Sequence, residues 1–148
     1  MVLLIISMLA GIAFQLDFQE RSSRVLDAAT ITAISTLREA QMQAIAGGSD
    51  VRVILATDLE GDLHGFQFLR GSSGTPFESI PLSEEVRFDD SVSGNQVVFD
   101  GLGTPTPDSN LPTVNTAPNP YYLDLDSWDG SETRRITIQS ATGQVRVE

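Results

Sequence analysis

The N-terminal third of the chain constrains the fold most strongly, because it reads as one very long helix. Residues 1–14 (MVLLIISMLAGIAF) carry no charge, whereas residues 15–46 are charged and contain neither proline nor glycine. Gly47–Gly48 stands where a helix C-cap is expected. We therefore predict a helix from near Met1 to about Ala46, roughly 45 residues and about 70 Å long. Its apolar residues recur at helical spacing, with alanines between them: Val25, Ile31, Ile34, Leu37 and Ile45.

The uncharged run at the start of this helix can be read in three ways. A helix over these residues would be about 20 Å long, shorter than the ~30 Å hydrocarbon core of a membrane. A secretory signal would have a basic segment first, which is absent, although Gly11 and Ala13 would suit a cleavage site. A buried helix of a soluble domain is the third reading.

The uncharged run continues into the amphipathic helix without a break. This favours a membrane or filament anchor, since a cleaved signal peptide needs no such continuation. We predict an anchor over residues 1–20, an amphipathic helix over 21–48 and a β-rich head over 49–148. The residues expected to make the anchor and assembly contacts are Leu3, Leu4, Ile5, Ile6, Leu9, Ile12 and Phe14.

After the helix, short apolar runs alternate with turn residues, which is typical of strands. RITIQSATGQVRV reads as a closing hairpin with its turn at Ala141–Gly143. Residues 101–120 hold five of the seven prolines and predict a long loop. Its part from Gly103 to Pro120 is expected to make specific contacts, so that its deletion leaves the domain folded but impairs assembly. The predicted strands are Val51–Thr57, Leu63–Leu69, Phe77–Leu82, Val86–Asp89, Gln96–Asp100, Tyr121–Leu125, Arg135–Gln139 and Gln144–Val147.

These elements predict an α+β fold in which one or two small antiparallel sheets pack on the amphipathic part of the helix. The net charge is −11 and every basic residue is an arginine. Such a chain repels nucleic-acid backbones at long range. No cysteine is present, which excludes disulfides, thiolate nucleophiles and cysteine metal sites.

The sequence gives no sign of catalysis. His64 is the single histidine and lies in a predicted strand, where a half-exposed structural role is the plainer reading. No phosphate-binding loop, dinucleotide fingerprint or paired-histidine zinc motif is present. We therefore predict a protein that is not an enzyme and that needs no cofactor.

Two clusters near the C-terminus are candidate binding sites. Carboxylates around a glycine turn are the hard oxygen ligands that calcium prefers, although their spacing misses the EF-hand pattern. They are Asp124, Asp126, Asp129 and Glu132. Arg134, Arg135 and Arg146 could meet across the closing hairpin and contact DNA, although pairing with nearby acids is the plainer reading.

Four segments, taken in order, resemble the GspH/FimT family of minor pseudopilins and minor pilins, which are type IV pilin-like proteins. MVLLIISMLAGIA is similar to the family's anchor helix just after its processing site, and STLREAQMQAIAGGSDVRVIL to its helix end and first strand. VVFDGLGTP and RRITIQSATGQVRV resemble its later strand and closing hairpin.

One feature departs from the family. Pilin-like proteins have a basic leader, a cleavage site and an early glutamate in the mature chain, whereas no glutamate precedes Glu20 here. The resemblance accommodates this if Met1 lies a few residues after the processing site.

The resemblance implies a pilin-like fold and a structural subunit of a type II secretion pseudopilus or a type IV pilus. The partners expected from it are other pilin subunits, the inner membrane and secreted cargo. The location expected is the inner membrane, crossed once with the head in the periplasm, or a cell-surface filament. Two alternatives stay open: a DNA-binding minor pilin that acts in DNA uptake, and a soluble secreted or periplasmic binding domain.

The processing state of the native protein distinguishes these readings. Mass spectrometry of the protein from cell envelopes is expected to show a methylated N-terminal residue shortly before Met1, followed by a glutamate. A mature chain that begins near Phe14 would instead identify the apolar run as a cleaved signal.

Overall fold

The N-terminal helix is confirmed as a single element. The computed structural model describes residues 2–59, 63–71, 76–88, 94–113 and 120–148, of which 2–19, 58 and 63 are described by backbone alone. Helix α1 spans Val2–Gly47. It ends in a Schellman-type cap, in which Gly48 has a φ of 57° and Ser49 N donates to Ala44 O at 3.3 Å.

Two four-stranded antiparallel sheets form the head. The first has the order β3-β2-β1-β5 and the second β4-β6-β7-β8. All eight predicted strands are confirmed in position, and their ends shift by up to two residues. The strands are β1 Val51–Leu59, β2 Leu63–Arg70, β3 Glu78–Pro81, β4 Val86–Arg87, β5 Gln96–Phe99, β6 Tyr121–Ser127, β7 Thr133–Ile138 and β8 Val145–Val147.

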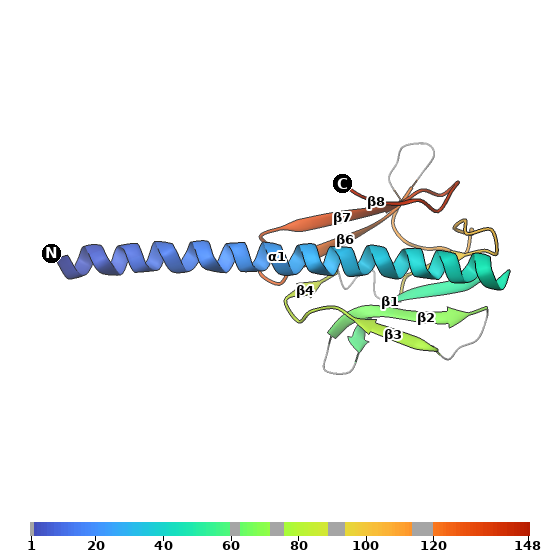
Figure 1. Cartoon of the computed structure of the whole chain (residues 1–148), viewed down its shortest axis with the longest axis horizontal. Coiled ribbons are helices and arrows are strands. Elements are labelled where there is room, and N and C mark those ends of the chain that lie inside the picture. The colour runs from blue at the N-terminus through green and yellow to red at the C-terminus, as the bar shows by residue number, and fades with distance from the viewer. Residues whose placement is uncertain (1, 60–62, 72–75, 89–93, 114–119) are drawn as a thin grey trace.

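The C-terminal half of α1 crosses both sheets (Figure 1). In that view β6, β7 and β8 lie on one side of the helix and β1, β2 and β3 on the other, while the N-terminal half of the helix projects beyond the head. The chain is therefore α+β, as predicted, and its helix extends well past the strands that cover it.

Small residues line the buried face of α1. Ala29, Ala33, Ala40 and Ala44 are at most 5 % exposed, so the helix axis can approach the sheets closely. Large side chains from the head fill the remaining space. The fully buried phenylalanines are Phe66, Phe68, Phe88 and Phe99.

The first part of the proline-rich loop is hydrogen-bonded to the first sheet, which argues against the expectation that the domain folds without residues 103–120. Thr106 N donates to Val98 O at 2.8 Å and Asn110 N to Gln96 O at 3.0 Å, so the loop covers the free edge of β5. Leu111 is buried. Periodicity could not reveal this pairing, because prolines interrupt the alternation. Residues 114–119 lie outside the described part of the chain.

Gln41 joins three distant segments at the C-terminal end of the helix. Its Nε2 donates to Gly103 O at 2.8 Å and to Thr142 O at 3.2 Å. The turn between β7 and β8 therefore lies where the sequence predicted it. Gly143, in this turn, has a φ of 68°, and a Cβ there would lie 2.2 Å from Gly103 O. Only glycine fits this close approach.

The requirement for small residues on α1 can be tested with one matched pair of substitutions. Ala33→Leu is expected to lower the free energy of unfolding by about 1–3 kcal/mol, because the added volume meets a closed core. Ala28→Leu makes the same change at an exposed position of the same helix. It is expected to change the free energy of unfolding by less than ~0.5 kcal/mol. Equal effects in chemical denaturation would contradict the packing described here.

Candidate assembly surface

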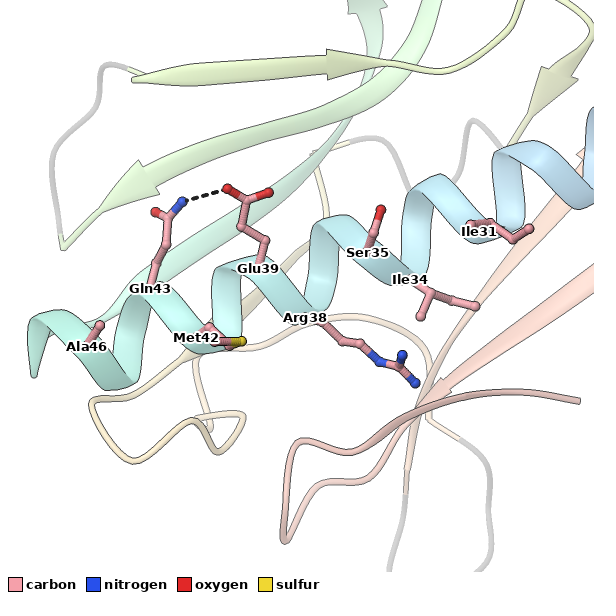
Figure 2. A pocket seen from close by; sticks show the side chains of 8 residues that line it. All are labelled: Ile31, Ile34, Ser35, Arg38, Glu39, Met42, Gln43 and Ala46. Atoms are coloured by element: carbon pink, nitrogen blue, oxygen red, sulfur yellow. Dashed lines mark hydrogen bonds between the residues drawn. The ribbon is translucent and has the colours of Figure 1, made fainter.

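One face of α1 is left uncovered by the head, and it is apolar. Ile31 is 68 % exposed, Met42 is 70 % exposed and Ile45 is 52 % exposed. The face follows from helical geometry, since each residue advances by about 100° and the exposed positions lie opposite the buried alanines. Figure 2 shows the open groove along this face, lined by Ile31, Ile34, Ser35, Arg38, Glu39, Met42, Gln43 and Ala46.

The polar side chains of this face are held by local hydrogen bonds. Glu39 accepts a hydrogen bond from Gln43 Nε2 at 3.2 Å, and Arg38 extends toward β8, 3.4 Å from Val145 O. Ser35 donates to the Thr32 carbonyl of the same helix at 2.8 Å. The groove therefore presents mainly hydrocarbon to a partner.

The predicted anchor residues continue this helix beyond the head. The side chains of Leu3, Leu4, Ile5, Ile6, Leu9, Ile12 and Phe14 lie outside the described residues. Among the described residues, no helix combines the length and the apolar character needed to cross a membrane.

The three candidate DNA-binding arginines do not form one cluster. Arg134 lies 3.0 Å from Asp27 of α1 and 3.3 Å from Glu132. Arg135 and Arg146 lie on the other face of the sheet, because β7 alternates and Arg146 pairs with Thr137 in the register.

The two outer arginines are also engaged. Arg135 donates two hydrogen bonds to Asp124, both at 2.7 Å, and its guanidinium lies 4.3 Å from the centre of the Tyr122 ring. The bonds to Asp124 hold the pKa of Arg135 above its usual value. Arg146 donates to Gln144 Oε1 at 2.8 Å. DNA binding stays a prediction, and these partners correspond to the plainer reading of paired strand arginines.

The calcium candidates are likewise bonded to neighbours. Asp126 accepts from Thr133 Oγ1 at 2.6 Å, and Asp129 from Ser127 Oγ at 2.7 Å and Ser131 N at 3.1 Å. The hydroxyl of Ser127 and the groups of Ser131 lower the pKa of Asp129. Within the part of the chain described, no three acidic, histidine or cysteine side chains are grouped so as to hold a metal ion. The calcium site stays a prediction.

His64 has a structural environment. Its Nδ1 accepts a hydrogen bond from Phe88 N at 3.3 Å, and its ring meets the Phe88 ring edge-on at 5.0 Å. The side chain is half-buried, as expected for a strand histidine. It links β2 to the segment that follows β4.

The exposed face can be changed without harm to the head. Ile31→Gln and Met42→Gln are expected to change the free energy of unfolding by less than ~0.5 kcal/mol, since neither side chain is in the core. Leu37→Gln places the same polar group at a buried position of the same helix and is expected to destabilise strongly. Thermal unfolding followed by circular dichroism measures all three, and a large loss for Met42→Gln would contradict its exposure.

Solved structures with this architecture come from filament systems. The type IV minor pilin FimU of Pseudomonas aeruginosa matches in two crystal forms, with TM-scores of 0.59 and 0.58. The first shares 18 % identity over 88 % of this chain and 92 % of that one, the second 16 % over 82 % and 91 %. The minor pseudopilin EpsH of the Vibrio cholerae type 2 secretion system matches with a TM-score of 0.50 and 16 % identity, over 82 % of this chain and 93 % of that one.

No protein-family model matches the chain, and no curated protein matches it significantly. The matched structures are those of a minor pilin and a minor pseudopilin. At 16–18 % identity the likeness is one of fold. The chain has the fold of the type IV minor pilins and minor pseudopilins, as its sequence resemblance implied.

Proposed function

We propose that this protein is a structural subunit of a type IV pilus or a type II secretion pseudopilus, and that it assembles through α1. The observation that carries the proposal is the uncovered apolar face of the helix, which runs along its C-terminal half toward the projecting part. A monomer in water gains nothing from this exposure, whereas packing against a neighbouring helix removes it from solvent.

Burial of these side chains would favour assembly. Full burial of an aliphatic or methionine side chain stabilises by about 1.5–3 kcal/mol. The exposed Ile31, Met42 and Ile45 together would therefore contribute several kcal/mol per contact, before the cost of ordering the subunits.

Before assembly, the projecting helix holds the subunit in the inner membrane with its head in the periplasm. When the subunit leaves the membrane, the apolar run loses its burial in lipid. Helix–helix packing in the filament must offset that loss. Membrane insertion and filament incorporation are therefore two alternative environments for the same apolar segment. The role that follows is mechanical and architectural rather than catalytic.

The absence of cysteines from the chain allows a direct test by cross-linking. A chain carrying both Leu9→Cys and Ile31→Cys is produced in cells that assemble filaments and is oxidised. We expect disulfide-linked ladders of this subunit, or links to neighbours that carry a matching cysteine, because the apolar segment of one subunit lies on the groove of another.

The control pairs Leu9→Cys with Val147→Cys, which is exposed on β8 of the head. It is expected to give few links. Efficient linking through Val147 and none through Ile31 would overturn assembly through this face. Absence of the protein from both membrane and filament fractions would overturn the proposed role altogether.

A further inference from the structure

We infer that Trp128 seats the head in the lipid headgroup layer while the subunit is still in the membrane. The inference rests on the proposed anchoring of α1 and adds a second, separate contact with the bilayer. Trp128 is the sole tryptophan of the chain and is 62 % exposed. Such exposure is unusual, because tryptophan is highly buried on average.

The turn that carries Trp128 lies at the end of the head from which the helix projects. Trp128 N donates to Glu85 O at 2.9 Å, and the Glu85 carboxylate accepts from Arg21 of α1 at 2.8 Å. The Arg134–Asp27 ion pair attaches the start of β7 to the same stretch of helix. In Figure 1 this is the side of the head that faces the projecting half of α1.

The height of this turn above the apolar run matches the headgroup layer. Phe14 ends the uncharged run and Asp17 is the first charge after it. Arg21 follows these residues by seven and four positions, which is about 10 Å and 6 Å along a helix. The polar layer on each side of a bilayer is roughly 5–8 Å thick. A helix that places Asp17 at the edge of the hydrocarbon therefore places Arg21 about 6 Å above that edge, within the headgroup layer. The turn of Trp128 is joined to Arg21 through Glu85 and so lies beside the same layer.

The chemistry of the turn suits that layer. Tryptophan gathers at membrane–water interfaces because its ring is apolar while its N–H can bond to water or lipid oxygens. The Arg87 guanidinium lies 5.4 Å from the centre of the Trp128 ring, and a long arginine side chain can keep its charge among the headgroups.

Hydrogen bonds within the turn order the backbone that carries Trp128. Ser127 N donates to Glu132 O at 2.9 Å, Ser127 Oγ donates to Asp129 at 2.7 Å, and Gly130 N donates to Ser127 O at 2.8 Å. The backbone around Trp128 is thus ordered before any membrane contact, which lowers the entropy cost of binding.

Two arginines of α1 at this end of the head are already paired with acids. Arg21 pairs with Glu85 and Arg24 with Glu20. The contact should therefore need no anionic lipid, and a zwitterionic phosphatidylcholine bilayer is expected to suffice. This separates the proposed contact from an electrostatic one.

Intrinsic fluorescence tests the inference on the full chain, because Trp128 is the only indole. The protein is inserted into phosphatidylcholine vesicles and purified by flotation. We expect a blue-shifted emission relative to the protein in detergent-free buffer, and at least about a twofold fall in quenching by aqueous acrylamide. Lipids brominated close to the headgroup are expected to quench more strongly than lipids brominated near the chain ends.

A variant with Trp128→Phe and Leu102→Trp provides the matched control. Leu102 is 83 % exposed. It lies near the C-terminal end of α1, because its neighbour Gly103 packs so closely on Ile45 that a Cβ on this glycine would lie 2.7 Å from the Ile45 side chain. Ile45 is 24 residues beyond Arg21, about 36 Å further along the helix. An indole at this distal position is expected to stay accessible to acrylamide and beyond the reach of brominated lipids.

The outcomes separate the two proposals. If the protein floats with the vesicles but Trp128 stays as accessible as the distal indole, the headgroup contact is overturned while anchoring stands. If the protein does not float, anchoring fails and the headgroup contact with it. If the blue shift disappears when the protein is diluted in excess lipid, another copy of the subunit covers Trp128, and the lipid contact is overturned.

Discussion

The close approach of α1 to two sheets at once is the contact on which the rest of the structure depends. The two sheets are separate hydrogen-bonded units, and the buried face of the helix supplies a surface common to both. Ala33, Ala40 and Ala44 allow the approach, while phenylalanines from the head fill the space that the alanines leave. Without the helix each sheet would expose one apolar face, so the head cannot be understood as a domain merely tethered to an anchor.

The same helix therefore has two environments, on opposite faces. One face belongs to the core of the head, and the other exposes Ile31, Met42 and Ile45 to solvent. A residue on α1 belongs to one face or the other by its helical angle, since about 100° separates successive positions. This division explains how the chain can fold as a monomer and still retain an exposed apolar surface, which is the surface that the proposed assembly would use.

Several tertiary contacts fix the helix against both ends of the head. Arg21 and Asp27 form ion pairs with Glu85 and Arg134 near the projecting part, and Gln41 bonds to two turns at the far end. Exposed ion pairs contribute little individually, at most about 1 kcal/mol. Their positions nevertheless set which turns lie beside the projecting part of α1 and which lie beside its C-terminal end. Trp128 and Leu102 owe their places at opposite ends of the head to these contacts.

Much of the fold was predictable because its local signals agree. The absence of proline and glycine from residues 15–46 predicted the helix, and short apolar runs between turn residues predicted all eight strands to within two residues at each end. The proline-rich loop was misjudged, because its hydrogen bonds to β5 come from backbone groups that no residue pattern reveals. The candidate arginines were correctly placed on the closing hairpin, yet strand alternation puts Arg134 and Arg135 on opposite faces.

By itself, then, the amino-acid sequence determined the long helix, the number and order of the strands, the acidity of the head and the absence of cysteine chemistry. These properties depend on residues close together in the chain or on composition alone. Only the tertiary structure decided which apolar helix residues are core and which are surface, since Leu37 and Ile34 look alike until the sheets are placed. It also decided that the turn bearing Trp128 lies where the helix leaves the head, because that depends on contacts of Glu85 with Arg21 and with Trp128, which are far from it in the sequence.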